Sequence, residues 1–176
     1  MARSRAILIQ IWNDPHFQEY TITEKLVFLF LFTNEKATQS GVYQLTYKDI
    51  FDKTGVSKSD VKEIITNHKK IVYDPKNHII WVKNYLKHNS VNKNPCNVVS
   101  AVVNDYKTTK RSPVWDGYWE HNGNLIEELI KKSASLQKKL ADGKIVLPKP
   151  LIKAWPTLDQ YINKTNLRVA QDISKA

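Results

Sequence analysis

The sequence predicts a mainly α-helical fold with a small β-hairpin, followed by a C-terminal helical extension. Three observations predict it. Apolar residues recur at helical spacing through most of the chain, Ser, Thr or Asn stands where such stretches begin, and two short β-branched runs flank an Asp-Pro-Lys-Asn turn. Hydrophobic residues make up 41% of the 176 residues, which is typical of a globular protein. We therefore expect a folded chain with its own core.

The first predicted helix contains the most apolar run of the chain, residues 26–32. Thr23 precedes this run and is expected to cap the helix, because its hydroxyl can accept a hydrogen bond from a free N–H of the first turn. The run is apolar in every direction, so we expect this helix to be buried on most sides. Gly41 then interrupts the chain, and residues 42–45 alternate well enough to predict a short strand.

The second predicted helix runs from Thr46, its cap, to about Lys53. Gly55 is expected to take the left-handed conformation that ends it. Its apolar side chains recur at helical spacing and are expected to be buried: Tyr47, Ile50 and Phe51.

The third predicted helix has a clear start at Ser57, with Asp60 in the first turn where the helix dipole favours a negative charge. At 100° per residue, one face collects Val61, Ile64, Ile65 and His68. The opposite face is polar and is expected to point outward: Ser59, Lys62, Glu63, Thr66, Asn67 and Lys70.

Two apolar runs then predict the β-hairpin, with strands at residues 71–73 and 78–82 joined by a tight turn at 74–77. The predicted order over residues 23–87 is helix, strand, helix, turn, helix and hairpin. That order is typical of a winged helix-turn-helix. In such proteins the third helix enters the major groove of DNA, and the hairpin lies against phosphates or the minor groove.

Helical signals continue through the C-terminal half of the chain. Asn94-Pro95 starts a helix with one apolar face, which includes Cys96. Ser112-Pro113 repeats the same start signal, although Gly117 weakens the helix that follows. The sequence Asn-Gly-Asn at residues 122–124 is expected to break that helix.

The chain is therefore predicted to divide at that break. Residues 1–122 form a winged-helix DNA-binding domain with flanking helices, and residues 123–176 form a helical extension for oligomerisation or partner binding. Within the extension, residues 125–140 are expected to form one amphipathic helix that ends near Gly143. A last helical pattern from Thr157 to Val169 follows a stiff connector that contains Pro148, Pro150 and Pro156.

Charge favours a polyanionic partner such as nucleic acid, because 27 Lys and Arg residues outnumber 17 Asp and Glu residues. The longest apolar run has seven residues, whereas a membrane-spanning helix needs about 20, so no membrane segment is expected. Residues 1–12 are also too interrupted for a secretory leader. A single cysteine excludes an intrachain disulfide and favours a cytoplasmic location.

Catalysis is not expected. The five histidines are scattered, and none pairs with another His or a carboxylate at a spacing typical of a metal site. Cys96 lies on an apolar helix face, as an inert buried thiol would. The five glycines form no phosphate-binding loop. We predict a protein that is not an enzyme and has no cofactor.

The outward face of the third predicted helix carries side chains suited to DNA. Asparagine can pair with adenine, lysine can donate to guanine, and threonine can contact a base edge or a thymine methyl group. Glu63 either accepts from cytosine or repels phosphate. An ordinary solvated helix and turn could carry the same residue types. The candidate DNA-binding residues are Ser57, Lys58, Ser59, Lys62, Thr66, Asn67, Lys69, Lys70, Lys76 and Asn77.

A second basic and aromatic tract lies further along the chain. It consists of Lys107, Lys110, Arg111, Trp115, Tyr118 and Trp119. Such a tract could stack single-stranded nucleic acid. Core aromatics at helical spacing are the favoured interpretation.

Several short phrases resemble the N-terminal winged-helix domain of phage replication proteins, the DnaD-like replisome organisers of phages that infect low-GC Gram-positive bacteria. The resemblance covers roughly residues 1–122. It rests on the basic start at residues 1–5 and on the apolar run at residues 26–32. It also rests on four short phrases: Gly-Val-Tyr at 41–43, Ile-Ile-Trp-Val-Lys-Asn-Tyr-Leu-Lys-His at 79–88, Asn-Lys-Asn-Pro at 92–95 and Ser-Pro-Val-Trp at 112–115. Residues 98–102 contribute as well.

This resemblance implies a DNA-binding protein of DNA replication initiation in a bacterial host cytoplasm. It further implies self-association, here as a homodimer, and delivery of a replicative helicase or its loader. The segment 125–176 is shorter than the family's second helical domain and has a different sequence pattern. Two alternatives stay open: a winged-helix transcriptional regulator, and a protein-interaction adaptor that does not bind DNA.

Overall fold

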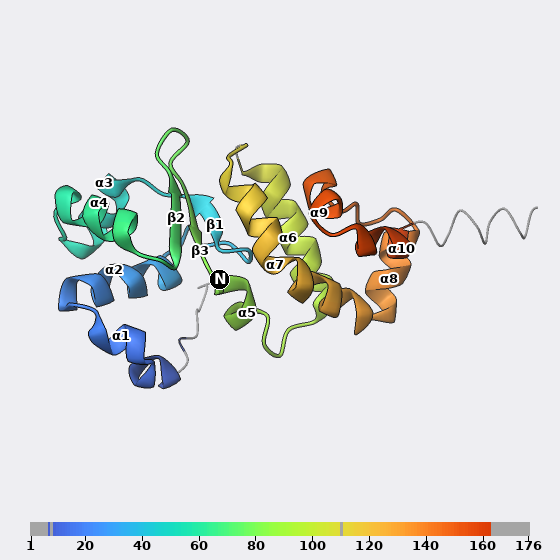
Figure 1. The fold of residues 1–176 in the computed structure, drawn as a ribbon, viewed down its shortest axis with the longest axis horizontal. Helices are drawn as coiled ribbons and strands as arrows, with labels where there is room; N and C mark the ends of the chain where they lie inside the picture. The colour runs from blue at the N-terminus through green and yellow to red at the C-terminus, as the bar shows by residue number, and fades with distance from the viewer. Residues whose placement is uncertain (1–6, 8, 110, 163–176) are drawn as a thin grey trace, which may run out of the picture.

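Helices lie on both sides of a small sheet in the computed structural model, which describes residue 7 and residues 9–109 and 111–162. The molecule is elongated, with α1 to α4 at one end, the sheet in the middle and α6 to α10 at the other end (Figure 1). The prediction of a mainly helical fold with a small hairpin is confirmed. Within the described part of the chain, none of the helices combines the length and hydrophobicity needed to cross a membrane.

The elements follow one another as short segments with short connections. In chain order they are η1 (Ile9–Asn13), α1 (Pro15–Glu19), α2 (Ile22–Thr33), β1 (Val42–Gln44), α3 (Tyr47–Thr54), α4 (Lys58–Asn67), β2 (Ile71–Asp74), β3 (Ile79–Val82), α5 (Tyr85–Asn89), α6 (Pro95–Thr108), α7 (Val114–Lys131), α8 (Ala134–Ala141), α9 (Lys149–Ala154), η2 (Pro156–Leu158) and α10 (Asp159–Ile162).

Helix α2 begins earlier than predicted, because its cap is Thr21 rather than Thr23. The Thr21 hydroxyl accepts from the Glu24 N–H, and the Glu24 carboxylate accepts from the Thr21 N–H at 2.7 Å. This reciprocal capping box satisfies two backbone donors at once, whereas Thr23 lies inside the helix. Of the apolar run at residues 26–32, Val27, Phe28 and Leu31 are buried, whereas Leu26 is 43% exposed.

Helix α3 and the turn after it follow the prediction closely. Thr46 caps α3 in a capping box with Asp49, and Gly55 ends it with a left-handed φ of 74°. Ile50 is buried as expected. Phe51 is not buried: it is 42% exposed, and the Lys58 ammonium lies 6.0 Å from its ring centre.

The three strands form one antiparallel sheet in the order β1-β3-β2. Val42 of β1 and Val72 of β2 both lie opposite Trp81 of the central strand β3. All four residues of β3 are buried, so helices cover both faces of the sheet. The order of the elements, with α3 and α4 joined by a tight turn at Gly55 and followed by the β2–β3 hairpin, is the order predicted from the sequence.

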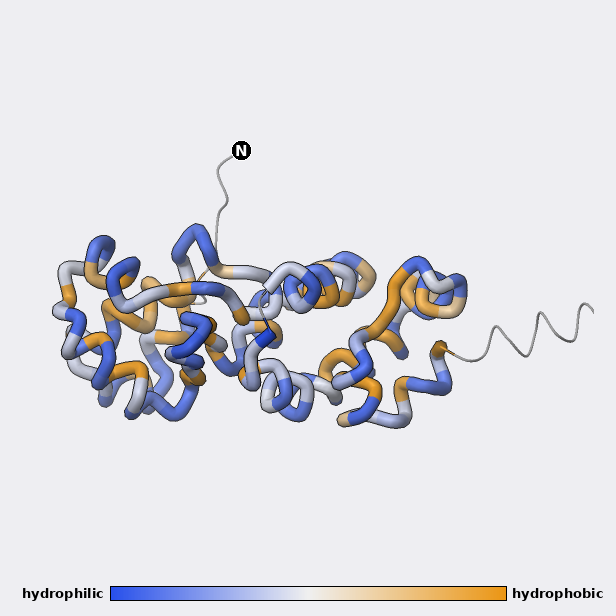
Figure 2. The backbone as a smooth tube through the Cα atoms, turned by 90° about the horizontal axis from the view of Figure 1, so that it is seen from above, coloured by the Kyte–Doolittle hydropathy of each residue, from blue (hydrophilic) through white to orange (hydrophobic). Residues whose placement is uncertain are grey.

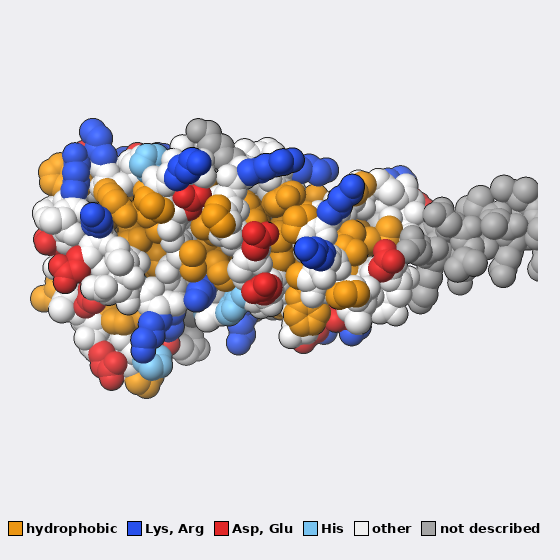
Figure 3. Space-filling view, turned by 45° about the horizontal axis from the view of Figure 1, so that its top comes forward, with side chains coloured by type: hydrophobic (Ala, Val, Ile, Leu, Met, Phe, Trp, Pro, Cys, Tyr) orange, Lys and Arg blue, Asp and Glu red, His pale blue; other side chains and the backbone are white. Residues whose placement is uncertain are grey.

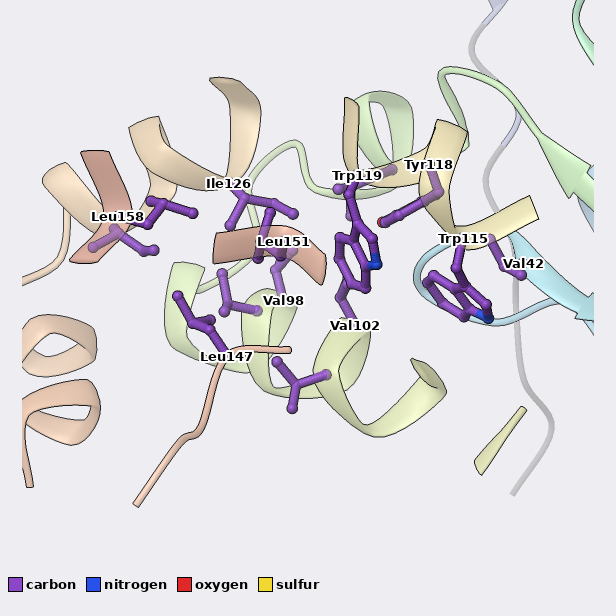
Figure 4. Packing of buried hydrophobic residues seen from close by; sticks show 14 of the residues in the cluster. Val42, Val98, Val102, Trp115, Tyr118, Trp119, Ile126, Leu147, Leu151 and Leu158 are labelled. Atoms are coloured by element: carbon purple, nitrogen blue, oxygen red, sulfur yellow. The ribbon is translucent and has the colours of Figure 1, made fainter. Parts of the chain in front are cut away.

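Alternate residues of β3 belong to two separate cores, because successive side chains point to opposite faces of a strand. Ile80 and Val82 join the core toward α2, α3 and α4, here called the wing-side core. Ile79 and Trp81 join the core toward α6 and α7, here called the helical core. Figure 2 shows apolar stretches along both halves of the molecule, and Figure 4 shows part of the helical core.

Helix α7 runs without a break through residues 122–124, which contradicts the predicted interruption and places the predicted boundary inside a helix. Gly123 is required by packing. A Cβ atom at this position would lie 1.7 Å from Nε1 of Trp155. That nitrogen donates a hydrogen bond to the carbonyl of Trp119 at 3.1 Å, so the indole lies across the α7 backbone. α7 therefore joins the two predicted domains through one core.

The remaining C-terminal segments also differ from the prediction. The expected helix over residues 125–140 is two helices, because α7 ends at Lys131 and Ser133 caps α8. α8 ends at Ala141, close to Gly143 as expected, and Gly143 has a left-handed φ of 68°. The predicted proline connector instead forms α9 and η2, with prolines at positions of the first turn where a missing N–H costs nothing. Val169 lies outside the described residues.

Candidate nucleic-acid interface

Helix α4 is held by its apolar face, so that its polar face is left at the surface. Val61 and Ile65 are buried in the wing-side core, as predicted. The N–H of His68 donates to the Ile64 carbonyl and ends the helix. Exposed side chains cover the opposite face: Lys58, Ser59, Asp60, Lys62, Glu63, Thr66 and Asn67.

At the start of α4, two of the candidate hydroxyl groups have structural partners. The Ser57 hydroxyl accepts from the Asp60 N–H at 3.2 Å and is half-buried. It also shares a hydrogen bond of 2.8 Å with the Ser59 hydroxyl. Ser57 therefore acts mainly as the helix cap, and Ser59 offers the more exposed hydroxyl.

Further along the helix, the exposed side chains differ in how many of their polar groups already have a partner within the protein. Lys62 has no ion-pair partner among the described residues. The Thr66 hydroxyl donates to the Lys62 carbonyl at 2.8 Å, which leaves its methyl group and its acceptor capacity for a partner. Asn67 is the last helical residue and is exposed.

Charge on α4 itself is balanced, with Lys58 and Lys62 matched by Asp60 and Glu63. The positive excess comes from the turn and hairpin that follow. Residues 58–87 contain seven lysines and three acidic residues. Figure 3 shows Lys and Arg side chains spread along one face of the molecule, with acidic side chains among them.

The prediction that Lys70 lies on the outward face of the helix is wrong, because α4 ends at Asn67. Its ammonium lies 3.7 Å from the Asp14 carboxylate, and its N–H donates to Nδ1 of His68. The backbone N–H of Phe17, followed by the charge of Lys70, lowers the pKa of Asp14 despite partial burial. Lys70 therefore fastens the end of α4 to the N-terminal segment, whereas the neighbouring Lys69 is exposed.

His68, at the end of α4, packs against two aromatic side chains of the N-terminal part of the chain. Its ring stacks on Phe28 with a centroid distance of 5.3 Å and meets Tyr20 edge-on at 4.9 Å. Burial, and then the charge of Lys70, lower its pKa. The imidazole is therefore a neutral aromatic support for the end of α4.

The turn between β2 and β3 is built around one carboxylate. Asp74 Oδ1 accepts from the Lys76 N–H at 3.0 Å, and its Oδ2 accepts from the Asn77 side-chain amide at 2.8 Å. Asn77 is thereby committed to the turn and is half-buried. Lys76 is exposed, so it is the side chain of this turn that is available to a partner.

The predicted aromatic tract does not form a stacking surface. Trp115, Tyr118 and Trp119 are each at most 2% exposed and pack against one another in the helical core (Figure 4). The favoured interpretation as core aromatics is confirmed. The basic residues Lys107 and Arg111 of the same tract are exposed, and Lys110 lies outside the described residues.

Among the described residues, no three His, Cys, Asp or Glu side chains gather in a way that could hold a metal ion. One shallow hollow lies between α2 and α3, where Lys36 and Asp49 form an ion pair at 2.8 Å. Its described lining contains no nucleophile beside a base. Neither a family model, nor a curated protein, nor a solved structure matches the chain.

Proposed function

We propose that the protein binds duplex DNA, with α4 in the major groove and the β2–β3 turn along the phosphate backbone. The observation that carries this proposal is that an exposed polar helix face and an exposed lysine, Lys76, belong to α4 and to the hairpin that packs against it. α4 packs directly against β2, the strand that leads into the hairpin turn. A helix and an adjacent hairpin held in this way suit the dimensions of the major groove and the neighbouring backbone.

The exposed side chains divide into two roles. Lys62, Thr66 and Asn67 lie along the outer face of α4, and their types suit donor and acceptor groups on base edges. Lys58, Lys69 and Lys76 flank that face and would neutralise phosphates, which gives affinity without sequence preference. Ser57, Lys70 and Asn77 would not contact DNA but would hold α4 and the hairpin turn in place through their bonds to Asp60, Asp14 and Asp74.

The biological setting proposed is phage DNA replication, and this rests on the sequence resemblance described above. A homodimer, and a helicase or its loader as partner, belong to the same proposal. A transcriptional regulator using the same helix is the related alternative. Footprinting separates the two, because a promoter site favours repression and an array of repeats at an origin favours replication.

A protein-interaction adaptor is a second candidate function. It is favoured by Asp60 and Glu63, which lie exposed on the same helix as Lys58 and Lys62 and cancel their charge. Such a mixed surface suits a protein partner with complementary charges. Capture of one stoichiometric partner after nuclease treatment, with no DNA binding by the pure protein, would support the adaptor instead.

Fluorescence anisotropy with a labelled duplex tests DNA binding directly. The parent protein is compared with Lys62→Ala/Lys69→Ala and with the control Lys138→Ala/Lys139→Ala, which removes two exposed charges from α8. We expect affinity to fall with rising salt and to fall further in the first variant, with a log-log salt slope lower by about one for each phosphate that is no longer neutralised. Equal binding by both variants, or no duplex binding at low salt, would overturn the proposal.

A further inference from the structure

The corner between α6 and α7 has its aromatic and basic residues on opposite sides. Trp115 and Trp119 point into the helical core, whereas Lys107 and Arg111 are exposed. No aromatic side chain of this tract is therefore available for stacking on bases. What the corner offers a partner is positive charge.

A hydrogen bond fixes this corner to the hairpin turn. The Ser112 hydroxyl donates to Oδ2 of Asp74 at 2.6 Å, while the Lys76 N–H donates to Oδ1 of the same carboxylate. Asp74 is only 8% exposed, so water hardly competes for these bonds. Ser112, followed by Asn77, lowers the pKa of Asp74, which keeps the carboxylate ionised at neutral pH. One buried anion therefore ties the backbone of Lys76 to the residue next to Arg111.

The two segments also lie at the same edge of the molecule, where the hairpin turn and the α6–α7 corner both project (Figure 1). Within the described part of the chain, Lys76, Lys107 and Arg111 have no ion-pair partner. The exposed acid closest in sequence to Arg111 is Asp116, in the first turn of α7. In the described part of this edge, these three cations are therefore free to contact a partner. The nearby carboxylate of Asp74 is buried and accepts hydrogen bonds from Lys76, Asn77 and Ser112.

We propose that the α6–α7 corner extends the DNA-binding surface, with Lys107 and Arg111 contacting duplex phosphates beside those contacted by Lys76. This inference rests on the proposed function, because it names more of the surface that grips the same duplex. Arginine suits this task, since its planar guanidinium can donate two parallel hydrogen bonds to one phosphate. Ser112 acts as a positioning residue that keeps the corner in register with the hairpin turn.

The test compares duplex binding by Lys107→Ala/Arg111→Ala with the parent and with Lys138→Ala/Lys139→Ala, which has the same net charge. Both substituted residues are exposed, and circular dichroism checks that the fold is kept. We expect affinity to fall more than about tenfold at about 0.1 M salt and the log-log salt slope to fall by about 2. The α8 variant should bind much more nearly like the parent, because it changes only the overall charge.

Ser112→Ala provides a second variant without any change of charge. If the corner is held in register by Asp74, affinity should fall while the salt slope stays closer to the parent value. Binding by Lys107→Ala/Arg111→Ala equal to the α8 control, with Lys62→Ala/Lys69→Ala still impaired, would overturn this inference and leave the proposed function intact. An effect confined to single-stranded DNA would overturn it as well. No duplex binding by the parent would remove the proposed function itself.

Discussion

The two cores on either side of β3 are built differently. The wing-side core is closed by short helices, and α2, α3 and α4 each begin with a hydroxyl side chain that caps the first turn. The helical core is closed by the long helices α6 and α7 and is centred on aromatic rings. The central strand contributes alternate residues to each core. Packing in the helical half therefore also supports the central strand of the sheet.

A second link between the two halves lies away from β3. The buried carboxylate of Asp105 on α6 accepts from the Ser40 N–H at 2.9 Å, just before β1. Burial raises the pKa of Asp105, although its bonds to the turn at residues 38–40 oppose this. Together with the bond from Ser112 to Asp74, it links α6 and the corner before α7 to the segment before β1 and to the β2–β3 turn. These two bonds therefore hold α6 and the corner before α7 against the sheet and its turns.

The largest expected effect is on the shared strand. Trp81→Ala removes a side chain that is 3% exposed and packs edge-on against Tyr118 at 5.6 Å. We expect a decrease of about 3–5 kcal/mol in the free energy of unfolding, measured by urea denaturation. Val146→Ala is the control, because Val146 is 61% exposed. If the two variants are destabilised to a similar extent, packing of Trp81 in the helical core does not contribute to stability as expected.

The next effect tests the contact between α7 and α9. Gly123→Ala places a methyl group where the Trp155 indole lies, and we expect a decrease of about 1–3 kcal/mol in the free energy of unfolding by heat or urea. Gly117→Ala is the matched control on the same helix, since its Cβ would lie 3.7 Å from the Trp81 ring, an ordinary contact. Relief of helical glycine entropy should make that variant neutral or more stable by up to about 1 kcal/mol. Equal effects from the two substitutions would contradict the packing role of Gly123.

The smallest effect concerns the wing-side core and its caps. Partial burial alone would raise the pKa of Asp49, but hydrogen bonds from Lys36 and Thr46 lower it to about 2. A lowered pKa stabilises the fold above the ordinary value of 3.8, and this contribution disappears as pH falls toward 2. Asp49→Asn should cost about 1 kcal/mol at pH 7 and weaken the decline of stability between about pH 4 and pH 2.

The control for this variant is Asp52→Asn, which removes the same charge from an exposed ion pair with Lys48 without breaking the cap. It should cost less at pH 7, since surface pairs contribute little. Urea denaturation at several pH values distinguishes the two. A pH dependence of Asp49→Asn identical to that of the parent would contradict the role of the Asp49 cap.

The sequence predicted the N-terminal half of the structure better than the C-terminal half, because local signals define the first and long-range contacts define the second. The caps at Thr46 and Ser57 and the turn at Gly55 are local signals, so the starts of α3 and α4 and the two hairpin strands were predicted to within one residue, whereas α4 ends at Asn67, before Lys70. Gly123 was misinterpreted as a break, because its partner Trp155 lies 32 residues further along the chain, and local propensity carries no information about that contact. Helix α5 was missed, since it is short and Asn84 begins it without a side-chain cap.

The candidate surface shows the same limit. Exposure of Lys62, Thr66 and Asn67 follows from helical periodicity and could be predicted. The partners of Lys70 and Asn77 could not, because Asp14 is remote in sequence and the Asn77 amide turns inward to Asp74. Ser112 was known only as a helix-start signal, and its bond to the hairpin turn becomes visible only in three dimensions.

Mapping of backbone amide shifts during titration with duplex DNA tests the central claim most directly. The protein is compared in ¹H–¹⁵N spectra without and with a saturating duplex. Binding through α4 and the hairpin turn predicts the largest shifts at residues 58–69, 76 and 77, with smaller ones in α8 and α9. Shifts concentrated on α8 and α9, or no shifts at low salt, would contradict it.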